Sequence, residues 1–199
     1  MTLPEYVRFC LAAAWGFLAL AAGQTALANE ATWQALQRGG MVVLMRHTSA
    51  EQGPGKGSVL LRDPTCLKAR NLSQRGQVEA KYVGQVFQRR SIPVGEVLSS
   101  PSCRTQDTAR LAFGSTTPVD FLSLSEVLTP SEAARITADA LKQIGEYQGS
   151  ANRVMVTHEP NIAVISFEWG LQGAFLVLKP QGGSTFNVLG TIRLEDLEH

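Results

Sequence analysis

Two segments of this chain each place a histidine directly after a short apolar run. His47 follows the run at residues 41–45, and His158 follows the run at residues 153–157. Apolar runs of this length are typical of buried strands. In an open α/β sheet, ligands bind in the crevice beyond the carboxyl ends of the strands. We therefore expect the two histidines to face one bound group.

The composition limits the number of domains and the kinds of partner that the chain can have. The chain has 199 residues, of which 44% are hydrophobic and 18% are charged, so it suits one globular domain with a sizeable core. Its formal net charge of +1 gives no electrostatic reason to expect nucleic acid as a partner. Any site for an anion must therefore depend on a local cluster of cationic side chains rather than on the net charge of the protein.

Residues 1–28 have the pattern of a secretory signal peptide. Arg8 lies beside an apolar stretch at residues 9–22, and Ala26 and Ala28 form the small-x-small pattern read by signal peptidase. About 14 apolar residues fall short of the ~20 needed to cross a bilayer, which disfavours an uncleaved anchor. We predict cleavage after Ala28, a periplasmic or secreted protein, and no stable membrane span after cleavage.

The mature domain is expected to span residues 29–196, because residues 197–199 resemble the start of an expression tag. It would keep two cysteines, Cys66 and Cys103, in an oxidising compartment, which predicts a disulfide between them. Two unrelated buried thiols are the alternative. The cysteines and histidines lack the spacing of a metal site, so we expect no metal.

The rest of the chain alternates between strand and helix patterns. Strands are expected at 41–45, 94–99, 119–122 and 153–157, helices at 73–90, 105–113, 129–147 and 161–169, and a closing hairpin at 174–178 and 185–192. This alternation predicts an α/β fold, a three-layer αβα sandwich with a mainly parallel sheet.

The segment between Thr48 and Asn71 interrupts this alternation. At about 23 residues, it is long for a loop inside a compact domain, and such loops are usually functional or disordered. It is rich in glycine and carries cations, including Arg62 and Arg70. These two arginines are candidate substrate contacts at the entrance of an anion site. A solvated surface loop is the alternative.

Four short motifs occur in order along the chain: Arg46-His47, the segment Asn71–Gly76, the segment Ser99–Thr105 with Thr108-Ala109, and Thr157-His158. Together they resemble the signatures of the histidine phosphatase superfamily, in its phosphoglycerate-mutase-like branch. The leader and the cysteine positions resemble a periplasmic subgroup related to the lipopolysaccharide core heptose phosphate phosphatases.

The resemblance implies a metal-independent phosphomonoesterase without a cofactor. His47 would attack phosphorus and form a phosphohistidine, which water then hydrolyses. Arg46, Arg104 and His158 would bind the phosphoryl group, and the planar fork of arginine suits that task. Thr48 would donate its hydroxyl to the phosphate or cap a turn.

Two glutamates compete to be the general acid. Glu126 follows the expected strand at 119–122, close to where the family carries its acid, but the glycine that usually follows is missing. Glu159 resembles the acid of the phytase-like branch. Asn161 would orient His158 or, as we favour, cap the helix that follows.

The resemblance implies a small phosphorylated substrate, such as a phosphosugar or a cell-envelope glycolipid. Two other functions stay open: a non-catalytic protein that binds a phosphate ligand or the envelope with the same pocket, and a mutase. Composition requires no particular oligomeric state.

Overall fold

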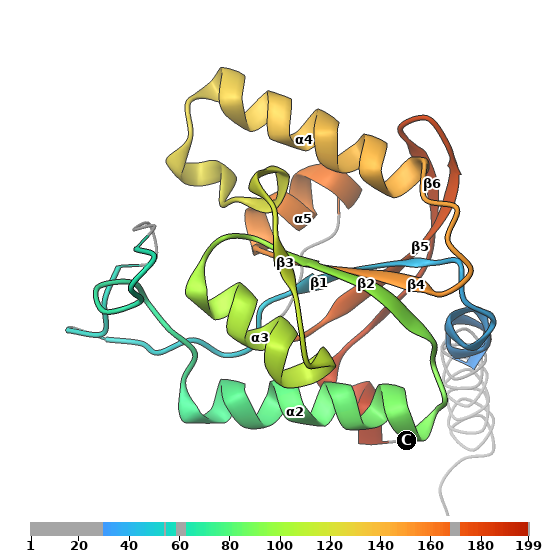
Figure 1. Ribbon diagram of the computed structural model, residues 1–199, viewed down its shortest axis with the longest axis horizontal. Coiled ribbons are helices and arrows are strands. Elements are labelled where there is room, and N and C mark those ends of the chain that lie inside the picture. Colours follow the sequence, from blue (N-terminus) through green and yellow to red (C-terminus); the bar gives the residue numbers. More distant parts are fainter. Residues whose placement is uncertain (1–29, 54, 59–62, 168–171, 199) are drawn as a thin grey trace, which may run out of the picture.

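The computed structural model describes residues 30–53, 55–58, 63–167 and 172–198. The predicted signal peptide and Arg62 lie outside these residues. One six-stranded sheet runs through the molecule in the order β3-β2-β4-β1-β5-β6 (Figure 1). Its strands are β1 (Val42–Arg46), β2 (Val94–Ser99), β3 (Thr117–Pro118), β4 (Asn152–Thr157), β5 (Phe175–Gly182) and β6 (Thr185–Ile192).

The sheet is mainly parallel, as expected. β1 and β2 both pair in parallel with β4, and β3 pairs in parallel with β2. The closing hairpin adds β5 antiparallel to β1 and β6 antiparallel to β5. β1 therefore lies inside the sheet with a partner strand on each side, and its residues 42–45 are fully buried because both faces of the sheet are covered as well.

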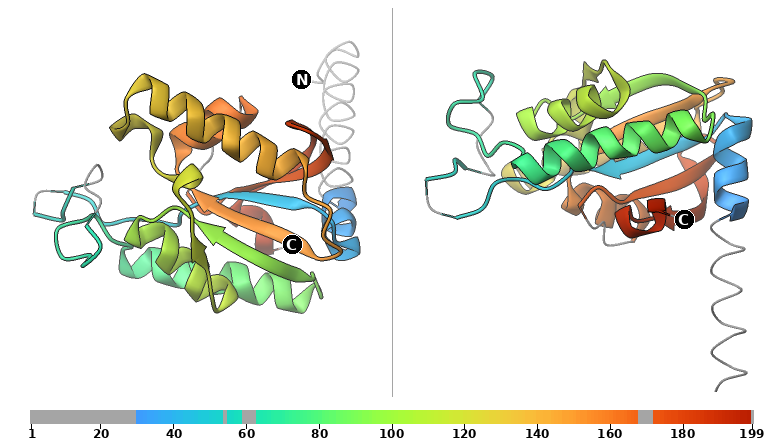
Figure 2. Two further views of the ribbon diagram at one scale, coloured as in Figure 1. Left: turned by 45° about the horizontal axis from the view of Figure 1, so that its top comes forward. Right: turned by 90° about the horizontal axis from the view of Figure 1, so that it is seen from below.

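Helices cover both faces of the sheet, which confirms the three-layer sandwich. The helices are α2 (Gln74–Arg89), α3 (Cys103–Phe113), α4 (Pro130–Gly145) and α5 (Glu159–Ser166). In Figures 1 and 2, α2 and α3 lie on one face, and α4 and α5 lie on the other. Along β1, Val43 and Met45 join the core under α2, whereas Val42 and Leu44 join the core under α4 and α5.

Two helix starts follow from capping residues in the sequence. The Ser73 hydroxyl accepts a hydrogen bond from the Gly76 N–H at 3.1 Å at the start of α2. Thr129 and Glu132 form a reciprocal capping box before α4, and Pro130 occupies its first turn. These interactions satisfy N–H groups that the first turn of a helix leaves without partners.

The expected strand at 119–122 is wrong. The third strand is β3, two residues earlier, and residues Asp120–Leu122 form the short 3₁₀ helix η1. Leu122 is fully buried and packs with α4 and α5 rather than extending the sheet beside β2. A short apolar run does not distinguish a strand from a buried turn, so the sequence pattern was ambiguous here.

Both ends of the described chain pack against the core under α2. Residues 30–38 form a helix from which Trp33 contacts the rings of Phe87 and Phe175 edge to face. At the other end, Leu197 is buried, and its carbonyl accepts a hydrogen bond from the Tyr82 hydroxyl at 3.2 Å. Leu197 thus contributes to the fold, although we expected the domain to end at residue 196. None of the described helices is long and apolar enough to span a bilayer.

Candidate active site

His47 and His158 lie side by side because their strands are neighbours. β1 and β4 run in parallel with Arg46 opposite Thr157, so the residue after each strand emerges at the same edge. The His47 N–H donates to the Thr157 carbonyl at 3.1 Å, which extends the pairing by one residue. The two ring centroids are 5.6 Å apart. The expected convergence of the two histidines is therefore present.

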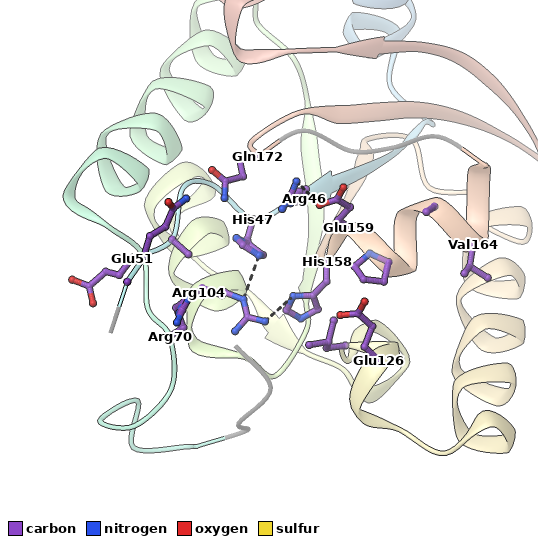
Figure 3. Close-up of a pocket in the computed structure, with 16 residues that line it drawn as sticks. Arg46, His47, Glu51, Arg70, Arg104, Glu126, His158, Glu159, Val164 and Gln172 are labelled. Atoms are coloured by element: carbon purple, nitrogen blue, oxygen red, sulfur yellow. Dashed lines mark hydrogen bonds and ion pairs between the residues drawn. The ribbon is translucent and has the colours of Figure 1, made fainter. Parts of the chain in front are cut away.

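Arg104 connects the two imidazoles. It lies in the first turn of α3, directly after β2, and only 3% of its surface is exposed. Its Nε donates to His47 Nε2 at 3.2 Å, and its Nη2 lies 3.2 Å from His158 Nδ1 (Figure 3). Because a guanidinium can only donate, both of these ring nitrogens must act as acceptors.

The remaining ring nitrogens then carry the protons. His47 Nδ1 lies 2.8 Å from the Thr48 carbonyl oxygen, to which its N–H donates. His158 Nε2 lies 2.9 Å from the Ser100 hydroxyl oxygen, which accepts its proton in a hydrogen bond. Each imidazole is thus neutral with one defined tautomer, and Nε2 of His47 keeps its lone pair directed toward Arg104.

Burial keeps both histidines neutral. It lowers the pKa of His47 from 6.5 to about 3, the Thr48 carbonyl opposes this change, and the charges of Arg104 and Arg46 reinforce it. Burial, followed by the charge of Arg104, also places the pKa of His158 well below its usual value. At neutral pH, both rings are therefore available as uncharged bases or nucleophiles.

The arginines, in contrast, crowd positive charge at the same place. Burial, followed by repulsion from Arg70 and Arg46, lowers the pKa of Arg104 to about 10, so it still carries its charge at neutral pH. An anion bound between these guanidinium groups would relieve their mutual repulsion. The site is therefore electrostatically suited to an anionic ligand.

A cavity of about 770 Å³ opens over these groups. This volume is within the range of small-molecule sites. The residues expected to act on a phosphoryl group line it together: Arg46, His47, Arg104, His158, Glu126, Glu159 and Arg70. In the part of the chain that the structure describes, we find no group of three histidine, cysteine or acidic side chains placed to hold a metal ion.

The two candidate acids differ in their partners. Glu159 begins α5, and its carboxylate lies 2.7 Å from Arg46 Nη1. Glu126 enters the cavity from the single-turn 3₁₀ helix η2 (Ser125–Val127). Figure 3 shows Glu126 next to His158 and Glu159 next to Arg46.

Asn161 holds the segment that carries Glu126, which differs from the cap we expected. His158 itself is the N-cap residue of α5, so Asn161 lies within the first turn of that helix. Its side-chain amide donates to the Ser123 carbonyl at 2.7 Å and accepts from the Ser125 N–H at 3.3 Å. These two hydrogen bonds attach η2 to α5 and so fix the position of Glu126 relative to His158.

Thr48 lies away from the cavity, contrary to its expected contact with phosphate. It is fully buried, and its hydroxyl donates to the Gly76 carbonyl at 2.8 Å. Its N–H donates to the Thr108 hydroxyl at 3.2 Å. The chain turns inward after His47, and Thr48 connects α2 to α3 below the site.

The long loop after Thr48 is tied to the site by a covalent bond. Cys66 and Cys103 form the expected disulfide, with their Cα atoms 5.9 Å apart. Cys103 directly precedes Arg104, so the bond joins the loop to the start of α3. Arg70, at the far end of the loop, lines the cavity, and its Nε and Nη2 donate to the Gly57 carbonyl at 3.2 and 3.1 Å.

Several residues at the site were not predicted. Ser100 accepts a hydrogen bond from His158. Gln172 and Glu51 line the cavity, and Val164 lines it from α5. Ser100 lies within the motif at 99–105, so its position in the sequence was a signal we did not use. The other three carry no local pattern that would separate them from surface residues.

Comparison with known proteins places the fold. No protein-family model matches this sequence, and no curated protein matches it. Among solved structures, the protein histidine phosphatase SixA complexed with tungstate is similar over 79% of this chain and 99% of that chain, with a TM-score of 0.55 and 18% identity.

Two further solved structures are similar to this chain over most of their length. Phosphoglycerate mutase from Thermus thermophilus is similar over 77% of this chain and 98% of that chain, with a TM-score of 0.53 and 17% identity. Phosphoserine phosphatase in complex with 3-phosphoglyceric acid from Entamoeba histolytica is similar over 79% and 98%, with a TM-score of 0.53 and 13% identity. The chain therefore has the phosphoglycerate-mutase-like fold.

Proposed function

We propose that this protein is a histidine phosphatase that hydrolyses small phosphate monoesters. The observation that carries this proposal is the contact of one buried guanidinium, Arg104, with both imidazoles at the base of a cavity. Tungstate, the ligand of the similar SixA structure, is a tetrahedral oxyanion like phosphate. The shared fold and the four ordered motifs support the same assignment.

In the proposed reaction, the neutral His47 attacks the phosphorus atom through Nε2. A bond from Nε2 to phosphorus forms as the bond from phosphorus to the ester oxygen breaks, and the leaving oxygen takes the electron pair. On substrate binding, Arg104 would donate to phosphoryl oxygens instead of to His47 Nε2. Arg46 and His158 would complete the set of groups that stabilise the charge in the transition state.

A second displacement restores the enzyme. Water attacks the phosphorus of the phosphohistidine, the bond to Nε2 breaks, and inorganic phosphate leaves. The carboxylate that gave its proton to the leaving oxygen accepts one from this water. Both steps use only groups of this chain, and we expect chelators to leave turnover intact.

We propose Glu126 as the general acid. Glu159 is paired with Arg46 at 2.7 Å, so its carboxylate is directed toward an arginine that would bind the phosphoryl group. Glu126 is held at the cavity through the two hydrogen bonds of Asn161. A positioned carboxyl group next to the ester oxygen is what departure of an alkoxide requires.

We further propose that the protein acts outside the cytoplasm, in the periplasm or as a secreted protein. The disulfide between Cys66 and Cys103 supports this, because such bonds persist in oxidising compartments. The signal-peptide pattern at residues 1–28 points the same way. A phosphorylated sugar of the cell envelope is what the resemblance to the heptose phosphate phosphatases implies, whereas the lining of the cavity favours a more apolar ester.

Trapping of the phosphoenzyme tests the central step. A rapid quench with a ³²P-labelled monoester should leave label on His47 in the wild type and none in His47→Ala. Retention of tungstate binding without any turnover in the wild type would favour a binding protein instead. Loss of activity with EDTA and its recovery with zinc would contradict the mechanism.

The two glutamates form a matched pair for testing the acid. A p-nitrophenolate leaving group needs little protonation, whereas an alkoxide needs a proton, so loss of the acid should slow alkyl phosphates much more than p-nitrophenyl phosphate. We expect this selective loss in Glu126→Gln. If Glu159→Gln showed this selective loss and Glu126→Gln did not, Glu159 would be the general acid instead.

A further inference from the structure

One wall of the cavity is lined largely by apolar side chains, although Glu126 and Glu159 come from the same two segments. Leu124, Pro160, Ala163 and Val164 line it, from the segment before η2 and from α5. Glu51 and Arg70, from the loop after Thr48, line the cavity as well and lie away from Val164 in Figure 3. The α5 side of the cavity is therefore more apolar than the loop side.

α5 carries aliphatic side chains on two opposite sides. Ile162 and Ile165 are buried in the core between the helix and the sheet. Val164, on the opposite side, is 55% exposed, although it is a large aliphatic residue. Ligand cavities are commonly lined by apolar side chains of this kind. Here the uncovered side of the helix faces the cavity.

The apolar wall begins at the phosphate site itself. Pro160 is separated from His158 by a single residue, and Val164 follows one turn later on the same helix. Leu124 precedes Glu126, the residue proposed to protonate the ester oxygen. A phosphoryl group between Arg104 and the two histidines would therefore direct the group attached to its ester oxygen along this wall.

We propose that the leaving alcohol is apolar next to the phosphate, as in an alkyl or aryl phosphate, and that it packs against α5. This inference rests on the proposed phosphatase function and specifies its substrate class. Burying an alkyl group against Val164 removes apolar surface of both from water, which is favourable. Against the same wall, the hydroxyls of a sugar would lose hydrogen bonds to water without replacement, which costs free energy.

Hexyl phosphate and glucose 6-phosphate provide a direct test, because both are six-carbon esters of a primary alcohol. We expect kcat/KM of the wild type to be at least tenfold higher for hexyl phosphate, since several methylene groups would contact the wall and each contributes roughly fourfold. Val164→Thr keeps the shape of the side chain and replaces one methyl by a hydroxyl. It should lower kcat/KM for hexyl phosphate roughly fourfold and leave that for glucose 6-phosphate unchanged.

Val188→Thr is the matched control. Val188 lies on β6, is 43% exposed and does not line the cavity, so the same substitution there should change neither substrate. Equal or faster hydrolysis of glucose 6-phosphate by the wild type would overturn the inference. An equal effect of Val164→Thr on both substrates would overturn it too.

A failure of the apolar subsite can be distinguished from a failure of the phosphatase proposal. If neither ester is hydrolysed, the phosphatase assignment fails, and the wall is then tested by binding. Hexylphosphonate should bind more tightly than methylphosphonate, and Val164→Thr should reduce that preference. Equal affinity of the two phosphonates would refute an apolar subsite, whatever the catalytic activity of the protein.

Discussion

Acid should destabilise this protein because His47 is buried in its neutral form. Its pKa is 6.5 in an unfolded chain and about 3 in the folded one. Between these values, the unfolded chain binds a proton that the folded chain does not, so stability falls as the pH decreases below 6.5. At pH 5.0, about 1.5 units below the unfolded pKa, the loss from this residue is about 2 kcal/mol.

Urea denaturation at pH 7.5 and 5.0, in buffer without phosphate, measures this loss. The wild type is compared with His47→Asn, which does not titrate and keeps a donor for the Thr48 carbonyl. Because the other titrating groups, His158 included, are present in both proteins, the wild type should lose about 2 kcal/mol more than the variant over this range. Equal losses in the two proteins would refute the idea that His47 is held neutral by burial.

Three further outcomes are expected. Reduction of the disulfide between Cys66 and Cys103, which are 37 residues apart, should lower the free energy of unfolding by about 3–4 kcal/mol. An unchanged urea midpoint would show that other contacts hold the loop. Thr48→Val should cost about 1–3 kcal/mol of stability through its lost buried hydrogen bonds and leave vanadate affinity unchanged. A large loss of vanadate affinity would instead place that hydroxyl on the phosphoryl group. Ser100→Ala should lower kcat roughly five- to tenfold and alter its pH profile, because His158 Nε2 loses the nearer of its two hydroxyl partners and keeps only Ser102 at 3.4 Å. Recovery in Ser100→Thr would show that the hydroxyl is responsible, and an unchanged profile in Ser100→Ala would exclude this role.

The convergence of the site was predictable because it depends on strand order more than on side-chain detail. His47, His158 and Arg104 each follow directly after a parallel strand or begin the helix after one. Parallel strands expose their carboxyl ends at one edge, so residues distant in sequence must meet there. The capping residues Ser73 and Thr129 marked helix starts equally well, because their side chains satisfy local N–H groups.

Other features depend on tertiary contacts that the sequence pattern does not contain. The hydroxyl of Thr48 can donate in many directions, and only the packing of α2 against α3 brings the Gly76 carbonyl within reach. Val164 has the same apolar character as Ile165, and only the position of α5 over the sheet determines which of them is buried. We expected Asn161 to cap a helix because an asparagine amide near a helix start can bond either to the N–H groups of that helix or to the backbone of a neighbouring loop.

Direct hydrogen bonding between β1 and β4 has a consequence for how such a protein can change. The separation of the two imidazoles follows from the spacing of paired strands, about 4.8 Å, which insertions elsewhere in the chain do not alter. The loop joined to α3 by the disulfide and the exposed side of α5 are under no such restriction. New alcohols could therefore be accommodated through substitutions at the rim, while the pair of rings that performs the chemistry keeps its spacing.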